Sequence, residues 1–408
     1  MLSVLSVAPY RRLFAAQVIA LLGTGLLTVA LGLLAFDLAG ADAGAVLGTA
    51  LTIKMVAYVA VAPIVAAAVD RLPRKAVLVG ADVVRAATAL GLPFVTEVWQ
   101  VYVLIFVLQS ASATFTPAFQ STIPQILPDE REYTKALSLS RLAYDLEAIV
   151  SPMIAAALLA IVSYSNLFAG TVLGFAVSAL LVLSTRVPAP TAPPPDSTFW
   201  RRTTEGVRVF ARARRLRFLL GMNFVVAAGT ALVLVNSVVY VKSVLQLDDS
   251  ALALTYAAYG GGSLLMALNV PRIVERWGII GPMTTGGLTV VAGLAATLVL
   301  TLVPDAAGAG WPLLLGAWAV LGAGTSLIGT PSARLLLAAS TEHNRSLVYT
   351  AQFSLSHACF LIGYPLAGWL GALSLAAAAA GLLGLAVIAG LIAVAMLRVG
   401  RARVGVPS

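Results

Sequence analysis

Residues 66–75 read AAAVDRLPRK, and their charged part at 70–75 separates two long apolar runs, at 45–69 and 76–95. Each run supplies about the 20 apolar residues that a helix needs to cross the hydrocarbon core of a bilayer. The break carries one acid and three basic side chains, Asp70, Arg71, Arg74 and Lys75. The segment therefore predicts two membrane helices joined by a tight, charged loop at the membrane surface.

The composition of the whole chain also indicates a membrane protein. Of its 408 residues, 60% are hydrophobic and 11% are charged, whereas a soluble globular chain is about 45–50% apolar and 25% charged. This balance excludes a soluble enzyme, a disordered protein and a fibrous protein. The single cysteine, Cys359, excludes a disulfide framework and a zinc–thiolate cluster. The net charge of +9 indicates basic cytoplasmic loops rather than nucleic-acid binding.

Twelve apolar runs of spanning length follow one another along the chain. Each must be helical, because an isolated strand in lipid leaves its amide groups unpaired. The first six are 13–36, 45–69, 76–95, 100–121, 136–160 and 166–185, and the second six are 218–241, 251–271, 281–303, 311–333, 346–370 and 373–397. The expected fold is an all-α membrane protein with twelve transmembrane helices.

The basic residues orient these spans. Four of the 26 Lys and Arg residues lie within or at the edge of spans: Lys54, Arg85, Arg141 and Arg334. Of the others, Lys242 alone lies on one side, and the remaining 21 lie on the side of both termini. Because basic loops stay in the cytoplasm, both termini are expected to be cytoplasmic.

A polar segment divides the spans into two sets of six. It begins with a proline-rich stretch at 188–195, typical of a stiff linker, and continues as a basic amphipathic stretch up to Arg217. Val207 and Phe210 are expected to rest on the membrane there. The predicted organisation is an N-terminal six-helix bundle at 1–186, a cytoplasmic linker with an amphipathic helix at 187–217, a C-terminal six-helix bundle at 218–397 and a cytoplasmic tail at 398–408.

The two sets of spans carry matching marks, as expected of a duplicated unit. The pairs are Asp70-Arg71 with Glu275-Arg276, 205 positions apart; Pro117 with Pro331, 214 apart; and Pro152 with Pro365, 213 apart. Proline kinks a membrane helix, so the four prolines are predicted kink sites. Paired kinks favour two bundles that bend around a central cavity.

This pattern resembles the major facilitator superfamily of transporters over essentially the whole chain. The superfamily's loop signature is G-x-L-a-D-R-x-G-R-K; residues 66–75 match its Asp-Arg and Arg-Lys parts, with Ala66 and Pro73 in place of the glycines. The resemblance implies two six-helix pseudo-repeat bundles and a role for Asp70 in steadying the outward-facing state near a helix end of the other half. The implied gating residues are Asp70, Arg71, Arg74, Lys75, Glu275 and Arg276.

Within the superfamily, the chain resembles the bacterial efflux branch. Pro152 matches the proline of a motif in proton-exchanging exporters whose glycines are here replaced, mostly by small residues. The stretch Thr116-Pro117-Ala118-Phe119 is similar to a branch that includes macrolide exporters, the enterobactin exporter and nickel-resistance permeases. The resemblance implies a multi-pass monomer in the bacterial inner membrane.

Several ionisable side chains lie within the predicted spans, where they are costly and tend to face a cavity or a partner. Glu147 is a candidate for proton coupling or substrate binding, and equally for a structural partner of Lys54. His357 is a candidate proton relay or substrate contact, or else a hydrogen-bonded packing residue. The remaining candidates are Asp37, at the outer end of the first span, and the pairs Arg141–Asp145 and Asp82–Arg85, whose spacing favours mutual neutralisation.

Uncharged amide side chains also occur within the spans, at Gln17, Asn223, Asn236 and Gln352. Such groups commonly form hydrogen bonds between membrane helices. We therefore expect them to tie helices together rather than to act as ligands.

The leading hypothesis is a proton-driven exporter of a small hydrophobic or cationic organic compound, working by alternating access. The expected partners are that substrate, protons and the lipid bilayer; no cofactor, metal, nucleic acid or enzyme activity is expected. The absence of a G-x-x-x-x-G-K-[ST] sequence argues against ATP drive. The alternatives are nickel or cobalt export, with a site built from His357, Glu147 and Asp145, and a non-transport role as a membrane scaffold or lipid scramblase.

Overall fold

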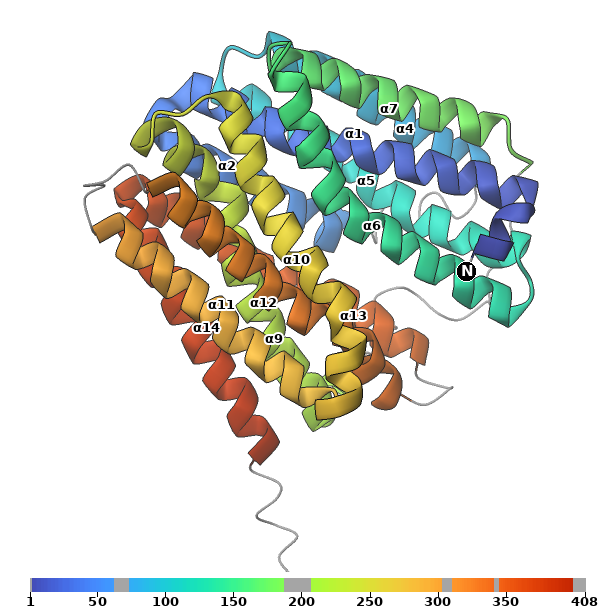
Figure 1. The fold of residues 1–408 in the computed structure, drawn as a ribbon. Helices are drawn as coiled ribbons and strands as arrows, with labels where there is room; N and C mark the ends of the chain where they lie inside the picture. Colours follow the sequence, from blue (N-terminus) through green and yellow to red (C-terminus); the bar gives the residue numbers. More distant parts are fainter. Residues whose placement is uncertain (1, 62–72, 187–206, 303–309, 341–344, 399–408) are drawn as a thin grey trace, which may run out of the picture. The chain divides into compact units, whose positions relative to one another are not determined.

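The computed structural model describes residues 2–61, 73–186, 207–302, 310–340 and 345–398. Every regular element within these ranges is a helix (Figure 1). The predicted all-α class is therefore confirmed for the described part of the chain. The physical reason is that a helix pairs its backbone groups within one segment, as a lipid environment requires.

Within the described residues, each predicted span coincides with helical structure. The first six correspond to α1 (Ala8–Ala39), α2 (Ala43–Val56) with the π-helical η3 (Ala57–Val61), α4 (Arg74–Gly91), α5 (Val98–Ile126), α6 (Glu130–Leu159) and α7 (Ser165–Leu183). The second six correspond to α9 (Arg214–Ala231) with η5 (Leu232–Asn236) and η6 (Val239–Val244), α10 (Asp249–Trp277), α11 (Ile280–Leu302), α12 (Gly310–Ala338), α13 (Arg345–Leu373) and α14 (Leu375–Arg398).

Ten helical segments of the described residues are long and apolar enough to cross a membrane. One of them, Ala8–Ala60, contains both α1 and α2, and its 53 residues would extend about 80 Å as one straight helix. Gly40 divides this segment with a φ of 55°, a conformation that glycine adopts without strain. In α6, the apolar stretch found is the shorter Val150–Leu159. The number of twelve spans stays a prediction.

The helices group into two compact units. The first unit contains residues 1–40, 56–196 and 248–257, and the second contains 41–55, 197–247 and 258–408. Most of α2 thus belongs to the second unit, and α10 is divided after Ala257. The predicted bundles at 1–186 and 218–397, with the linker between them, stay a prediction.

In the first unit, α1 packs against α5, α6 and α7, and α4 packs against α5 and α7. The α1–α7 contact is close because glycines face it: a Cβ atom on Gly174 would lie 3.1 Å from the carbonyl oxygen of Ile19. Thr171 also donates a hydrogen bond to the carbonyl oxygen of Gly23, at 2.8 Å. Small residues let membrane helices approach closely in this way.

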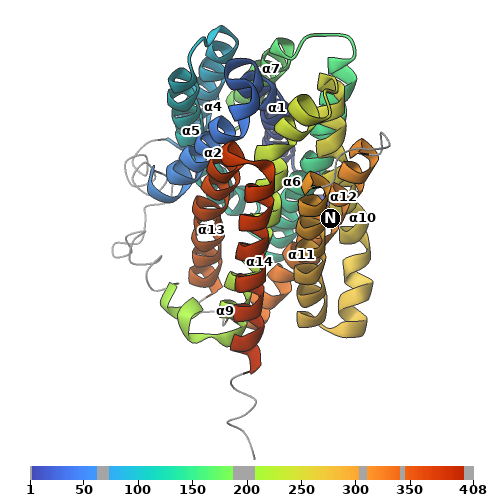
Figure 2. The ribbon, with the colours of Figure 1, turned by 90° about the vertical axis from the view of Figure 1, so that its left-hand side faces the viewer.

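In the second unit, α9 packs against α11, α12, α13 and α14 (Figure 2). Trp318 of α12 is fully buried, and its indole N–H donates to the hydroxyl of Ser237 at 2.7 Å. The ring of Tyr240 meets Trp318 edge to face, with 5.5 Å between ring centroids. These contacts bury aromatic surface and satisfy the indole donor.

The expectation that Phe210 rests on the membrane is wrong, because its side chain is 1% exposed within the protein. Phe210 lies on a helical turn at 207–212 that ends at Ala213, whose backbone is extended (φ −86°, ψ 119°). The turn therefore does not continue straight into α9, and its apolar ring packs onto the protein instead.

The helices run without interruption through the predicted kink sites. Pro152 lies inside α6, Pro331 inside α12 and Pro365 inside α13, and α5 includes position 117. A proline removes one backbone hydrogen bond from such a helix. The role of Pro117 and its three counterparts as kinks stays a prediction.

Candidate functional site

Glu147 lies on α6, where this helix meets α1 in the first unit. A Cβ atom on Gly25 of α1 would lie 2.6 Å from Oε1 of Glu147 and would collide with the side chain of Ser151. The missing side chain at Gly25 therefore makes room for the carboxylate beside the α1 backbone. Glu147 is half-buried, so it is neither sealed in the protein nor freely hydrated.

Ser151 lies one turn beyond Glu147 on α6 and is fully buried. Its hydroxyl has no hydrogen-bond partner among the described residues. Buried hydroxyls are normally paired, so this group has an unused donor close to the carboxylate at the α1–α6 contact.

Lys54 and His357 lie together in the second unit, on α2 and α13. The two half-buried side chains are close enough to interact electrostatically. Nδ1 of His357 is 2.7 Å from the carbonyl oxygen of Phe353, and the two rings are 4.2 Å apart. His357 thus has the hydrogen bond expected of a packing residue, while its proximity to Lys54 leaves the coupling hypothesis in place. The pairing of Lys54 with Glu147 stays a prediction.

The predicted pairing of Asp82 with Arg85 is confirmed. Both side chains are buried on α4, where they form a salt bridge. The second carboxylate oxygen accepts a hydrogen bond from Ser178 at 2.7 Å. The guanidinium lies between the rings of Phe115 and Phe175, at 4.3 and 4.5 Å from their centroids. This network ties α4, α5 and α7 together.

Asp37 is exposed near the C-terminal end of α1 and accepts a hydrogen bond from the hydroxyl of Tyr164. Burial, and then the bond to Asp37, raise the pKa of Tyr164. The arrangement fits a surface acid. The side chains of Arg141 and Asp145 lie outside the described residues, so their predicted pairing stays a prediction.

The gating candidates occupy helix ends where they are described. These are the half-buried pair in the first turn of α4 and the exposed pair in the last turn of α10: Arg74, Lys75, Glu275 and Arg276. Asp70 and Arg71 lie outside the described residues. The gating role of all six stays a prediction.

The four amide side chains form interhelical hydrogen bonds, as predicted. Asn223 and Gln352 pair reciprocally between α9 and α13, at 3.2 and 3.3 Å. Gln17 of α1 accepts from Ser140 of α6 at 3.0 Å. Asn236 donates to the carbonyl oxygen of Ala367 at 3.1 Å.

Three further hydroxyls come together in the second unit and were missed by the sequence reasoning. Thr230 of α9 and Thr325 of α12 lie on either side of Tyr259 of α10, with oxygen–oxygen distances of 3.0 and 3.1 Å. Small polar residues are common in membrane helices, so none of the three stands out in the sequence.

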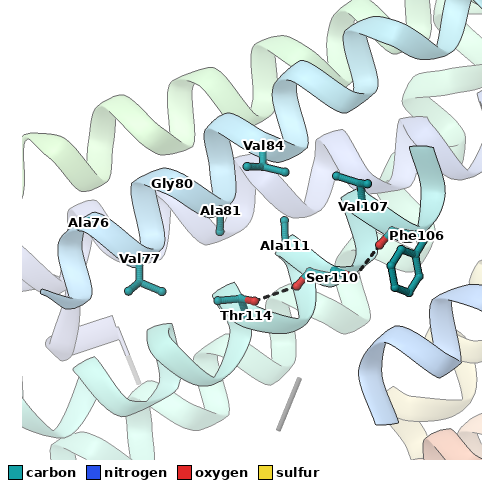
Figure 3. A pocket seen from close by; sticks show the side chains of 10 residues that line it. All are labelled: Ala76, Val77, Gly80, Ala81, Val84, Phe106, Val107, Ser110, Ala111 and Thr114. Carbon is teal, nitrogen blue, oxygen red and sulfur yellow. Dashed lines mark hydrogen bonds between the residues drawn. The ribbon is translucent and has the colours of Figure 1, made fainter. Parts of the chain in front are cut away.

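A groove of approximately 470 Å³ lies between α4 and α5 in the first unit (Figure 3). Its lining is apolar except for Ser110 and Thr114, whose hydroxyls bond to carbonyl oxygens of their own helix at 2.7 and 2.9 Å. With no free polar group to orient a ligand, and none of the charged candidates in its wall, this groove is not the candidate site. The described residues also contain no group of three His, Cys, Asp or Glu side chains placed to hold a metal ion.

The family can be assigned from residues 13–309, which match the family model described as "Major Facilitator Superfamily". The matched range covers most of the chain and includes the charged loop at 66–75. The chain belongs to the Major Facilitator Superfamily.

Curated relatives of this superfamily member include efflux proteins. The chain is 30% identical over 186 residues to macrolide efflux protein A of Enterococcus faecalis, covering 43% of this chain and 57% of the relative. It is 28% identical over 215 residues to macrolide efflux protein A of Streptococcus pyogenes, covering 51% and 52%. The matched region thus spans about half the length of these relatives.

Solved transporters share the fold of this superfamily member. The nucleoside transporter NupG has a TM-score of 0.69 at 16% identity, covering 96% of this chain and 98% of that one. A bacterial metal transporter has a TM-score of 0.66 at 12% identity, covering 96% and 99%. At such identities the likeness concerns the fold alone.

Membership of the superfamily makes the chain a multi-pass membrane protein of a transporter family, not an enzyme. Members of this family move small molecules across the membrane.

Proposed function

We propose that this chain is a proton-coupled exporter of a small hydrophobic or cationic organic compound, working by alternating access. Superfamily membership and the similarity to macrolide efflux proteins support export of an organic compound. Macrolides and amphiphilic cations are therefore the substrates to test first. The single observation that carries proton coupling is the position of Glu147.

The half-buried carboxylate of Glu147 lies between α1 and α6, opposite Gly25. Protonation at this place removes a charge from the helix contact and makes the carboxyl a donor as well as an acceptor. Deprotonation leaves the carboxylate with acceptors only, which suits the unused donor of the buried Ser151 hydroxyl. The α1–α6 contact therefore differs between the two protonation states.

Proton binding can shift the balance between inward- and outward-facing states only by its difference in free energy between them. A group whose surroundings change with the α1–α6 contact meets this requirement. Substrate release outside and proton entry would then be linked by one equilibrium, as alternating access requires.

The test is Glu147→Gln, which keeps the size of the side chain but removes its titration. Purified protein in vesicles with a pH gradient should lose gradient-driven export, while substrate exchange without a gradient should persist. Glu132→Gln, in the first turn of the same helix, is the matched control and should retain coupling. Undiminished gradient-driven export by Glu147→Gln would refute the role of this residue.

The remaining proposals concern gating and setting. The outward-facing state is proposed to be favoured by six charged residues: Asp70, Arg71, Arg74, Lys75, Glu275 and Arg276. Asp70→Asn should slow turnover without a large loss of substrate affinity, and a selective loss of affinity would contradict this role.

The protein is proposed to act as a monomer in the bacterial inner membrane with both termini in the cytoplasm. Reporter fusions to each terminus would test this orientation.

Nickel or cobalt export remains the second hypothesis. No described group of ligands supports it, and the likeness to a metal transporter concerns the fold alone. A scaffold or scramblase role has no described feature in its favour either.

A further inference from the structure

Three hydroxyls of the second unit form a continuous hydrogen-bonded chain across α9, α10 and α12. The oxygens of Thr230 and Tyr259 are 3.0 Å apart, and those of Tyr259 and Thr325 are 3.1 Å apart. Thr325 also donates to the carbonyl oxygen of Gly322 at 2.9 Å. The hydrogen-bonded series therefore ends on a carbonyl oxygen, which can accept a hydrogen bond but cannot donate one.

The direction of each bond follows from counting protons, because every hydroxyl has one. The carbonyl of Gly322 can only accept, so the proton of Thr325 is used there. Either oxygen could donate in the other two contacts, and with the proton of Thr325 directed to Gly322, Tyr259 donates to Thr325 and Thr230 donates to Tyr259. At the other end of this hydrogen-bonded series, Oγ1 of Thr230 keeps lone pairs that can accept a hydrogen bond but has no proton left to donate.

Close helix packing holds Tyr259 in this position. A Cβ atom on Gly322 would collide with the carbonyl oxygen of Tyr259, and one on Gly262 would collide with the backbone of Ala319. Glycines at the α10–α12 crossing thus set the height of the Tyr259 hydroxyl between its two partners. Hydrogen bonds in such a chain polarise one another, which strengthens the acceptor at its end.

The surroundings favour an aromatic, cationic ligand. Thr230 and Tyr259 are only half-buried, and Tyr364 of α13 lies near Tyr259. The ring of Phe360 lies 5.1 Å from that of Tyr364. On α9, α10 and α12, the Lys or Arg nearest along its helix is Arg334, nine residues or about 13 Å from Thr325. On the α13 side, Lys54 lies near His357, three positions before Phe360.

We propose that Oγ1 of Thr230 is a polar anchor that accepts a hydrogen bond from the N–H of a protonated amine on the substrate. The nearby aromatic rings would contact the apolar part of the substrate. This inference rests on the proposed function and narrows its substrate class to hydrogen-bond donors. A quaternary ammonium ion has the same charge and the same attraction to aromatic faces, but no N–H to donate. The anchor should therefore distinguish a protonated amine from a quaternary ammonium ion, although the two ligands have the same charge.

The test uses chlorpromazine, a tertiary amine protonated at neutral pH, and its N-methyl quaternary salt as probes. Binding of both to the purified full-length protein in nanodiscs is measured by competition at pH 7. Thr230→Val should weaken chlorpromazine binding about tenfold or more, as expected for a lost bond to a charged donor, and leave the quaternary probe within about twofold. Thr230→Ser, which keeps the hydroxyl, should restore the wild-type preference.

Thr289→Val is the matched control, since Thr289 of α11 is half-buried and its hydroxyl donates to the carbonyl oxygen of Thr285 on its own helix, at 2.9 Å. It should leave both affinities unchanged. An equal loss for both probes in Thr230→Val would overturn the anchor while leaving the substrate class intact. Failure of the wild-type protein to bind either probe would overturn both the anchor and the proposed class, whereas loss of proton coupling alone would concern only Glu147.

Discussion

At the scale of single residues, Gly25 controls how closely Glu147 approaches α1. Gly25→Ala adds one methyl group that collides with Ser151 and lies 2.6 Å from the carboxylate. The first side-chain atom of Ser151 cannot move without the backbone, so the helices must separate. We expect a cost of about 1–3 kcal/mol, seen as a lower melting temperature, together with reduced proton-driven export.

Gly80→Ala is the control for that variant, because a Cβ atom at Gly80 has open space around it. Alanine there should be neutral or slightly stabilising, since it restricts the unfolded chain more than glycine does. Equal melting temperatures and equal export for both variants would show that the α1–α6 contact tolerates separation.

The buried pair of Asp82 and Arg85 provides a second residue-scale prediction. Asp82→Asn leaves Arg85 buried without its counter-charge, which costs about 3–5 kcal/mol and should lower the apparent melting temperature markedly. Ser178→Ala, which removes only a neutral donor to the same carboxylate, should cost about 1–2 kcal/mol. The double variant Asp82→Leu with Arg85→Met should recover most of the loss. If Asp82→Asn were as stable as the wild type, the pair would not be structural.

The pair of Asp82 and Arg85 could be predicted from sequence spacing, whereas the series of three hydroxyls could not. Asp82 and Arg85 are three positions apart on one helix, so helical geometry alone places them on one face. Thr230, Tyr259 and Thr325 lie on three helices, and their meeting depends on how closely glycines let α10 and α12 approach. No spacing rule along one helix contains that information.

At the scale of helices, the crossing of α2 with α13 is made by glycines. A Cβ atom on Gly48 would lie 2.7 Å from Cα of Gly368 and 2.8 Å from the carbonyl oxygen of Tyr364. Nearby, the indole of Trp369 donates to the hydroxyl of Thr49 at 3.2 Å. The two backbones are therefore in direct contact, so the crossing has no room for a side chain.

Gly48→Val should force these helices apart and lower the apparent melting temperature by several degrees, at a cost of about 1–3 kcal/mol. Gly316→Val is the matched control, since a Cβ atom at Gly316 of α12 meets nothing within 4 Å. The same drop in both variants would assign the effect to valine in a helix rather than to the crossing.

Helix positions were predicted well, whereas helix partners were not predictable. α11 and α14 begin within two residues of the predicted spans at 281–303 and 373–397, because apolar length defines a helix in lipid. The grouping of most of α2 with the second unit leaves no mark in the chain, since nearly every face of α2 is apolar or small.

At the scale of the whole molecule, the proposed function predicts a pattern of resistance. A bacterium depleted of its own efflux pumps and expressing this chain should tolerate at least about fourfold more of a macrolide or an aromatic amine. Tolerance of Ni²⁺ and Co²⁺ should not change, since the described residues offer no cluster of metal ligands. Growth inhibition with and without expression measures this, and the Glu147→Gln variant should abolish the protection.

Protection against the metals alone would reverse the order of the two hypotheses. If the Glu147→Gln variant protected as well as the wild type, export would not require this carboxylate. Glu147 would then not be the proton site.

Apolar length, sparse charge and the one-sided distribution of basic residues were enough to establish a helical membrane protein and to predict its orientation. These properties act locally, because each helix in lipid must satisfy its own backbone and each loop meets its own side of the membrane. Only the packed helices reveal three features: the setting of Glu147 against Gly25, the proximity of Lys54 to His357 and the series of three hydroxyls. They depend on which helix faces meet, and residues far apart along the chain make those faces.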